Sequence, residues 1–264
     1  MKVVAWNMAH RVASWKALEK LDADIALLSE ARVLKTVNEN VLGGKKTEGR
    51  DRYSRPWATA VVSRHGLREI QDARASRYGR AVKVPFENSR PGSWTAAVVS
   101  VPDVGEVTAI SLYGLLDEKS DASVHRSLSE FSPIFEDARY NRLVLLGGDL
   151  NILANPQADD PGRERHLVVL ARIKAFGLAD CLEQAFLGRN PRRPGPPNCP
   201  CGLGHGCTHT WTKLDSKHPT VPYQDDYLFA SPALAERLVS CEALAHDVWP
   251  SPSDHYPAVA TFES

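Results

Sequence analysis

Short apolar runs recur along the whole chain, and polar residues border most of them. Asn7 directly follows Val3–Trp6, and Glu30 follows the run that starts at Ile25. The other bordering residues are Tyr113 after 109–112, Asp149 and Asn151 after 145–148, Asp226 before 227–229, and Asp254 and His255 before 256–262. Because strand ends in a layered α/β domain converge on one edge of the sheets, we expect these side chains to share one site.

Patterns with helical spacing separate the apolar runs. Trp15, Leu18 and Leu21 recur at that spacing after Ser14, which we expect to cap a short helix. A second helical pattern runs from 124 to 135 and contains Pro133, which should kink or break it. Many strands with helices distributed among them predict a layered domain of the α/β class.

We predict a single domain, 1–264, because strand patterns continue to the end of the sequence. The clearest interruption is 189–200, which has five prolines in twelve residues. A cysteine-rich segment follows directly, so we interpret the region around 189–209 as a Pro/Cys-rich loop inserted into that domain.

The bordering residue types suit phosphoester hydrolysis. A hard divalent cation such as Mg²⁺ takes oxygen ligands, and Glu30 is the best candidate ligand. A carboxylate near an attacking water molecule can orient and deprotonate it. An imidazole beside a carboxylate can stay protonated and stabilise negative charge on a phosphate.

Five segments in order resemble the signature motifs of the endonuclease/exonuclease/phosphatase superfamily. They are Trp6-Asn7, Leu28-Ser29-Glu30, Gly148-Asp149-Leu150-Asn151, Asp226-Tyr227 and Ser253-Asp254-His255. The superfamily includes apurinic-site endonucleases, pancreatic-type deoxyribonucleases, sphingomyelinases and inositol-polyphosphate phosphatases. The resemblance implies a four-layer α/β sandwich, with two packed mixed β-sheets flanked by helices.

The resemblance also implies a role for each residue. Glu30 would bind a catalytic Mg²⁺ or Mn²⁺, with Asn7 beside it and Asp254 at or next to the metal. Asp149 would orient or deprotonate the attacking water, and Asn151 would hold that water or the phosphate. His255 would contact the scissile phosphate with its ring held by Asp226, and Tyr113 falls where apurinic-site enzymes place a phosphate-contacting tyrosine.

Two positions depart from the family pattern or leave a choice. Gly114-Leu115-Leu116 follows Tyr113 where many members have proline and then Asn or His, so Tyr113 fits a core position as well as a catalytic one. Asp225 and Asp226 are adjacent. We expect Asp226 to pair with His255 because it directly precedes Tyr227, as in the family.

Three cysteines and two histidines lie within the eleven residues 199–209. Thiolate and imidazole are the ligands that zinc prefers, and we expect Cys199, Cys201, Cys207 and His209 to bind a structural Zn²⁺, with His205 as a substitute. The alternatives are a loop of unligated thiols or one strained disulfide.

Lys plus Arg equals Asp plus Glu, at 32 each, which argues against binding nucleic acid by bulk charge. Local basic clusters remain, and we expect Arg50, Arg52 and Arg55, together with Trp211, to contact substrate. The alternative for the arginines is a solvated loop.

These observations together predict a divalent-metal-dependent nuclease acting on DNA, with RNA as a further candidate substrate. A phosphomonoesterase or a phospholipid- or inositol-phosphate-type phosphoesterase is the alternative within the superfamily, and a catalytically silent nucleic-acid-binding module is the alternative outside enzymes. No apolar run approaches membrane-spanning length and the N-terminus has no secretory pattern, so we expect no membrane partner and a cytoplasmic location.

Overall fold

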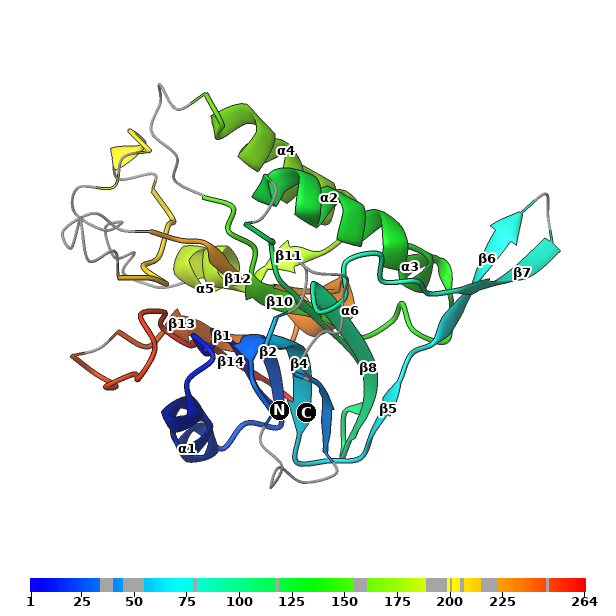
Figure 1. Cartoon of the computed structure of the whole chain (residues 1–264), viewed down its shortest axis with the longest axis horizontal. Coiled ribbons are helices and arrows are strands. Elements are labelled where there is room, and N and C mark those ends of the chain that lie inside the picture. Colours follow the sequence, from blue (N-terminus) through cyan, green and yellow to red (C-terminus); the bar gives the residue numbers. More distant parts are fainter. Residues whose placement is uncertain are drawn as a thin grey trace.

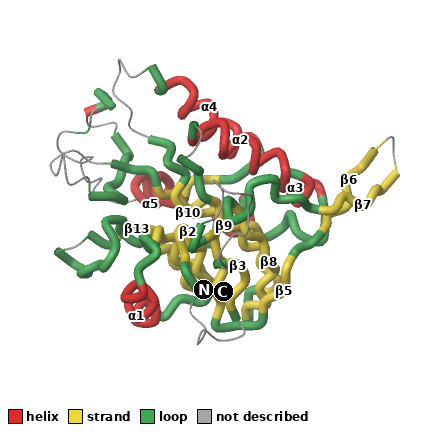
Figure 2. The backbone as a smooth tube through the Cα atoms, in the orientation of Figure 1, coloured by secondary structure: helices red, strands yellow, loops and turns green. Residues whose placement is uncertain are grey.

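The computed structural model describes residues 1–33, 40–44, 55–77, 80–116, 119–153, 161–188, 199, 201–204, 207–214, 223–245 and 247–264. Two six-stranded sheets dominate this part of the chain (Figures 1 and 2). The first sheet has the order β13 (Leu238–Ala243), β14 (Ala258–Phe262), β1 (Lys2–Asn7), β2 (Ile25–Ala31), β4 (Ala58–Ser63) and β3 (Val41–Gly43). The second has the order β11 (Ala179–Asp180), β12 (Asp226–Ala230), β10 (Val144–Asp149), β9 (Gly105–Leu112), β8 (Trp94–Val101) and β5 (Leu67–Glu69).

Both sheets are mixed, which brings the polar strand ends together. β1 runs parallel to β2, with Asn7 opposite Ser29, and β10 runs parallel to β9. β12 runs antiparallel to β10, so the first residue of β12, Asp226, lies opposite the last residue of β10, Asp149. The polar residues that border these strands therefore lie at one edge of the two sheets. We call it the polar edge.

The sheets pack face to face, and helices cover their outer faces. Alternate residues of β1 divide between the two sides: Val3 and Ala5 lie in the core between the sheets, while Val4 and Trp6 pack on the side of α1 (Val12–Leu21). The outer face of the second sheet packs against α2 (Ser120–Phe131), α3 (Pro133–Glu136) and α4 (Arg163–Ala175). The predicted four-layer α/β sandwich is confirmed.

The smaller elements complete the layers, and one local prediction is wrong. α5 (Cys181–Gly188) and α6 (Pro232–Ala235) lie beside β12, and the hairpin of β6 (Asp72–Arg77) and β7 (Arg80–Pro85) projects from the sandwich (Figure 1). Ser14 does not cap α1, because the helix begins at Val12 and the buried Ser14 hydroxyl instead donates to the Met8 carbonyl. β7 pairs only with β6 and belongs to neither large sheet.

Two serines join the sheets directly beneath the polar edge. Ser111 Oγ donates to the Leu28 carbonyl at 2.8 Å, and Ser29 Oγ accepts the backbone N–H of Asp149 at 3.0 Å. Gly148 makes this approach possible: its φ is +133°, and a Cβ there would lie 2.8 Å from Ser29 Oγ of the other sheet and 2.2 Å from the Leu112 carbonyl oxygen of the neighbouring strand β9. The sheets can therefore approach closely at this point only if residue 148 has no side chain.

We expect Gly148→Ala to lower the free energy of unfolding by about 3 kcal/mol, because it adds both a steric overlap and backbone strain. Gly177→Ala is the matched control, since Gly177 also has a positive φ (+82°) but a Cβ there would meet nothing within 4 Å. We expect that control to lose only about 1 kcal/mol. Equal losses in urea unfolding would show that the close contacts of position 148 with Leu112 and Ser29 are unimportant.

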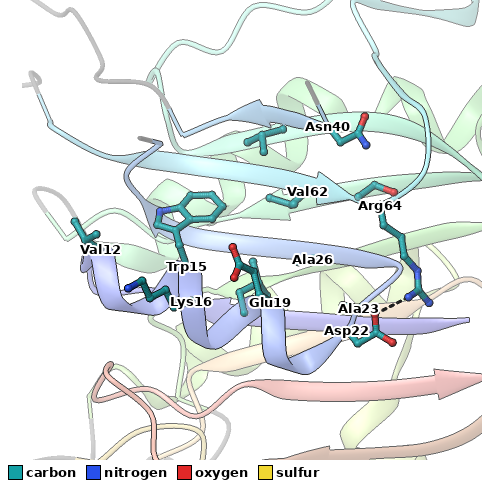
Figure 3. Close-up of a pocket in the computed structure, with 13 residues that line it drawn as sticks. Val12, Trp15, Lys16, Glu19, Asp22, Ala23, Ala26, Asn40, Val62 and Arg64 are labelled. Atoms are coloured by element: carbon teal, nitrogen blue, oxygen red, sulfur yellow. Dashed lines mark hydrogen bonds and ion pairs between the residues drawn. The ribbon is translucent and has the colours of Figure 1, made fainter. Parts of the chain in front are cut away.

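A groove of about 620 Å³ lies on the outer face of the first sheet, between α1 and the strands β2 and β4 (Figure 3). Trp15 and Val62 line it, and the ion pair between Arg64 and Asp22 closes one end. None of the described residues that line it belongs to the polar edge.

No helix in the described part of the chain has both the length and the apolar character needed to cross a bilayer.

Candidate active site

His255 lies at the centre of a buried group of carboxylates. Its Nδ1 is 2.7 Å from Asp226 Oδ2, and its Nε2 is 3.8 Å from Asp149 Oδ2. The adjacent Asp225 is more distant, with Oδ1 at 4.0 Å from Nδ1. All four side chains are buried, and Asp226 is completely inaccessible.

Backbone contacts fix the position of the histidine. The His255 N–H donates to Ser253 Oγ at 3.1 Å, and that hydroxyl donates to the Asn7 carbonyl at 2.8 Å. Trp6 Nε1 donates to the His255 carbonyl at 3.1 Å. The C-terminal segment is thereby attached to the end of β1, which brings together residues about 250 positions apart in sequence.

The carboxylates hold the imidazole in its charged form. Burial alone would lower the pKa of His255, but the charges of the three surrounding aspartates outweigh it and raise that pKa to about 10. Burial raises the pKa of Asp226 to about 6 despite the attraction of His255. At neutral pH, His255 is therefore an imidazolium whose Nδ1–H donates to Asp226 and whose Nε2 faces Asp149.

Asp149 is held by hydrogen bonds at both carboxylate oxygens. Asn7 Nδ2 donates to Oδ2 at 2.8 Å, and the Asn151 backbone N–H donates to Oδ1 at 2.8 Å. Burial and then the charge of Asp225 raise the pKa of Asp149 well above its usual value. A carboxylate with a raised pKa is a stronger proton acceptor than an exposed one.

Glu30 and Tyr113 form a second pair on the same edge. Tyr113 Oη donates to Glu30 Oε1 at 2.8 Å, and His10 Nδ1 lies 3.2 Å from Oε2. Burial and then the charge of Glu30 raise the pKa of Tyr113, so the phenol stays protonated. Glu30 has a positive φ of 47°, an uncommon conformation for a residue other than glycine, and its side chain is 18% exposed.

Asn151 is oriented by the loop that departs from the family pattern. Its Nδ2 donates to the Gly114 carbonyl at 2.9 Å, and the Gly114 N–H donates to the Asp149 carbonyl at 2.9 Å. A Cβ at position 114 would lie 1.8 Å from the Leu150 carbonyl oxygen. Position 114 therefore requires glycine, because the loop after Tyr113 closely approaches the loop that contains Leu150.

The remaining predicted residues lie at the rim or outside the described residues. Asp254 is exposed, and the close group of ligand atoms formed by Asp149, Asp225 and His255 does not include it. The Arg55 guanidinium lies 5.5 Å from the Trp57 ring, and Trp57 packs edge-on against Tyr113 at 5.2 Å. Trp211 is partly buried, and its Nε1 has no hydrogen-bond partner among the described residues. Arg50, Arg52 and His205 lie outside the described residues.

Sequence reasoning missed Lys213 and His10. Lys213 Nζ lies 3.5 Å from Asp225 Oδ2, and residue 213 forms isolated β-bridges with Tyr223 and His255. Burial would lower the pKa of Lys213, but the nearby aspartates, Asp225 first, raise it above its usual value. No local sequence pattern marks either residue as part of a site, although His10 lies only three positions after Asn7 and could have been considered a site residue for that reason.

The donor atoms at this edge fit a hard divalent cation. Asp149 and Asp225 place carboxylate oxygens within 4.8 Å of each other, and Asp226 Oδ1 is buried without a hydrogen-bond partner among the described residues. Glu30 adds a fourth carboxylate on the same edge, against the positive charges of His255 and Lys213. Oxygen donors with an excess of negative charge are what Mg²⁺ and Mn²⁺ prefer.

No protein-family model matches the chain, and no curated protein matches it in sequence. Solved structures do match over its full length. An AP endonuclease from Archaeoglobus fulgidus is 17% identical, with a TM-score of 0.63 and 100% of both chains covered. A 3′ phosphatase from Neisseria, bound to a product DNA hairpin, is 18% identical, with a TM-score of 0.62 and 100% of both chains covered.

A third structure, an endonuclease/exonuclease/phosphatase from Beutenbergia cavernae, is 17% identical with a TM-score of 0.57, over 98% of this chain and 70% of that one. At these identities the likeness establishes the fold. The chain therefore has the endonuclease/exonuclease/phosphatase fold that its ordered motifs predicted.

Proposed function

We propose that this chain, with its endonuclease/exonuclease/phosphatase fold, is a divalent-metal-dependent nuclease that hydrolyses phosphodiester bonds in DNA. The observation that carries the proposal is the buried array in which His255 lies between Asp226 and Asp149, at 2.7 and 3.8 Å. A protonated imidazole beside a carboxylate of raised pKa provides a donor for phosphate and an acceptor for a water proton at one place.

Asp149 is the general base of this proposal. Its carboxylate accepts a proton from the attacking water, and the hydrogen bonds from Asn7 and Asn151 hold it in position. The raised pKa increases its basicity, which general base catalysis requires near neutral pH. The water oxygen then attacks phosphorus in line with the leaving oxygen.

His255 and its neighbours stabilise the negative charge that develops on the phosphate. His255 Nε2–H donates to a non-bridging oxygen, while Asp226 keeps the ring protonated and oriented through Nδ1. The Asn151 amide, which gives one N–H to the Gly114 carbonyl, donates its other N–H to the phosphate. Tyr113, whose single O–H is given to Glu30, positions that carboxylate. Lys213 adds a positive charge from the Asp225 side.

Glu30 and Asn7 are the residues that we propose to hold the catalytic cation, with Asp254 bordering it from the rim. Glu30 presents a carboxylate, and Asn7 Oδ1 retains acceptor capacity beyond the hydrogen bond from Ala9 N–H. When bound, Mg²⁺ or Mn²⁺ supplies charge neutralisation at the phosphate and at the leaving oxygen.

DNA is the proposed substrate for two reasons. The Archaeoglobus protein of the same fold is an AP endonuclease, and the Neisseria protein is a 3′ phosphatase bound to a DNA product. Arg55, Trp57 and Tyr113 also form a continuous contact that leads from the rim to Glu30. A guanidinium beside an indole suits phosphate contact combined with base stacking.

We expect Arg55→Ala to raise the KM for duplex DNA about fivefold with little change in kcat, because it removes a phosphate contact worth about 1 kcal/mol. Arg68→Ala is the matched control, because Arg68 lies 6.0 Å from the Tyr140 ring at the far strand of the second sheet. Steady-state kinetics at two salt concentrations would measure the effect. An unchanged KM would remove Arg55 from the substrate surface.

The proposed function is tested by a substrate panel with the full chain. Plasmid, linear duplex, single-stranded DNA and RNA would be incubated with Mg²⁺, Mn²⁺ or EDTA, beside a small phosphate monoester. We expect cutting of DNA that requires the cation. Hydrolysis of the monoester alone would support the phosphomonoesterase alternative instead, and inactivity on every substrate would support a silent binding module.

A further inference from the structure

Beside the polar edge, Cys199, Cys201, Cys207 and His209 form a second group of converging ligand atoms. Their three sulfurs and one ring nitrogen all lie within 4.8 Å of one another. Cys199 Sγ and Cys207 Sγ each lie 3.4 Å from His209 Nδ1. All five cysteines of the chain are described, and none forms a disulfide.

The two sulfur-to-nitrogen separations of 3.4 Å match edges of a tetrahedral zinc site. With Zn–S near 2.3 Å and Zn–N near 2.0 Å, tetrahedral ligand atoms stand about 3.4 to 3.8 Å apart. A disulfide would bring two of the sulfurs to about 2.05 Å and remove them from the group. A set of three thiolates and one imidazole is also one of the combinations found in closed structural zinc sites.

The described backbone at 201–204 turns tightly beside the Cys201 sulfur. The Leu203 N–H donates to Cys201 Sγ at 3.4 Å, and the Cys207 N–H donates to the Gly204 carbonyl at 3.0 Å. Gly202 and Gly204 have positive φ values of 74° and 51°. The segment thus carries the glycines and the N–H to sulfur bond that let a short loop present several thiolates to one point.

The segment that follows His209 reaches the proposed catalytic edge within a few residues. Thr210 N–H donates to Gln224 Oε1 at 2.9 Å, which attaches the segment to the residues before β12. Thr212 Oγ1 then accepts the N–H groups of Asp225 at 3.2 Å and Asp226 at 3.1 Å. Lys213 comes next and lies beside Asp225.

We propose that Cys199, Cys201, Cys207 and His209 bind one structural Zn²⁺, which fixes the segment carrying Thr212 and Lys213 against Asp225 and Asp226. The zinc site is distinct from the Mg²⁺ or Mn²⁺ site, because its ligands are sulfur and imidazole rather than oxygen. The effect on catalysis rests on the proposed function, whereas zinc binding does not.

The first test measures the metal in the full chain, purified without chelators. Mass spectrometry of the metal content should find one zinc per chain. After zinc is replaced by Co²⁺, thiolate-to-cobalt charge-transfer bands in the near ultraviolet and intense tetrahedral bands in the visible should appear. Cobalt at the carboxylate edge cannot produce the thiolate bands, so wild-type protein without them would overturn the proposal even if every variant misfolded.

Variants then identify the ligands. Cys201→Ser and His209→Ala should each reduce the bound zinc at least tenfold, whereas Cys241→Ala, which alters a buried core cysteine, should retain it. His209→Cys should retain zinc and shift the cobalt bands to longer wavelength, as a fourth thiolate requires. Retention of zinc by Cys201→Ser and His209→Ala, or its loss from Cys241→Ala, would contradict the assignment.

The link to catalysis is measured separately. Removing zinc should lower kcat on DNA at least tenfold, and adding zinc back to the stripped chain should restore it. If zinc binds as described but no DNA is cut at any metal content, the proposed function fails and the zinc site stands. If the protein cuts DNA and contains no zinc, the zinc site fails and the proposed function stands.

Discussion

Asp149→Asn is expected to lower kcat on duplex DNA by about three orders of magnitude, which is the usual contribution of a positioned general base. The amide has nearly the same shape and keeps an acceptor for the Asn151 N–H, but it loses the hydrogen bond from Asn7 Nδ2 and cannot take a proton from water. We expect the melting temperature to change little, because removing a buried charge from a group that already contains Asp225 and Asp226 offsets the lost hydrogen bond.

Asp180→Asn is the matched control for that variant. Asp180 is another buried aspartate, and burial raises its pKa to about 6. Its carboxylate accepts the N–H groups of Leu182 and Glu183 at the start of α5 and contacts no residue of the polar edge. Full activity in Asp180→Asn beside a collapse in Asp149→Asn assigns the loss to chemistry. A kcat for Asp149→Asn within tenfold of wild type would exclude Asp149 as the base.

The second large effect is expected from His255. His255→Gln should reduce kcat about a hundredfold or more, since it removes the charged donor to the phosphate. His65→Gln is the matched control, because His65 Nε2 also lies 2.8 Å from an aspartate, Asp24, in a pair outside the edge. Similar losses in the two variants, measured under single turnover, would show that a general loss of stability is responsible.

The pH dependence separates the positioning role of Asp226 from a purely structural one. With a pKa of about 10, His255 stays protonated through neutral pH, so its alkaline limb of kcat/KM should fall near pH 10 in the wild type. Asp226→Asn removes the closest negative charge, and the limb should move about one to two pH units lower. NMR titration of the His255 ring would check the same shift without activity, and an unmoved pKa would contradict the account.

Stability should follow the same titration. The pKa of His255 is raised in the folded state, so its contribution to stability is fully present below its unfolded pKa of about 6.5. That contribution is lost as the pH rises through the folded pKa, near 10. Between these values the melting temperature of the wild type should therefore fall more steeply than that of His255→Gln.

The fold and half of the candidate site could be predicted because their signals are local. A buried strand that ends in a polar residue is visible over a few positions, and Asn7, Glu30, Asp149 and Asp226 all occupy such strand ends. The cysteine group was also visible, since its four members lie within eleven residues. The predicted break at Pro133 is also a local signal, and the structure has it between α2 and α3.

The rest depended on contacts that join distant segments. Lys213 reaches Asp225 and His255 from irregular backbone, and nothing in its own neighbourhood marks it. His10 contacts Glu30, and both residues have positive φ values, which residues other than glycine adopt uncommonly. The expected cap at Ser14 was wrong for a local reason: the helix begins at Val12, and the Ser14 hydroxyl donates to the Met8 carbonyl in the turn before it.

Single-turnover cleavage in water enriched in oxygen-18 tests the central claim most directly. A duplex oligonucleotide would be cut by the full chain with Mg²⁺, and the mass of the new terminal phosphate would be measured. In-line attack of water on phosphorus predicts one heavy oxygen in that phosphate, with no product in EDTA or with Asp149→Asn. Cleavage that leaves the phosphate unlabelled, or that continues undiminished in EDTA, would contradict metal-dependent hydrolysis at this edge.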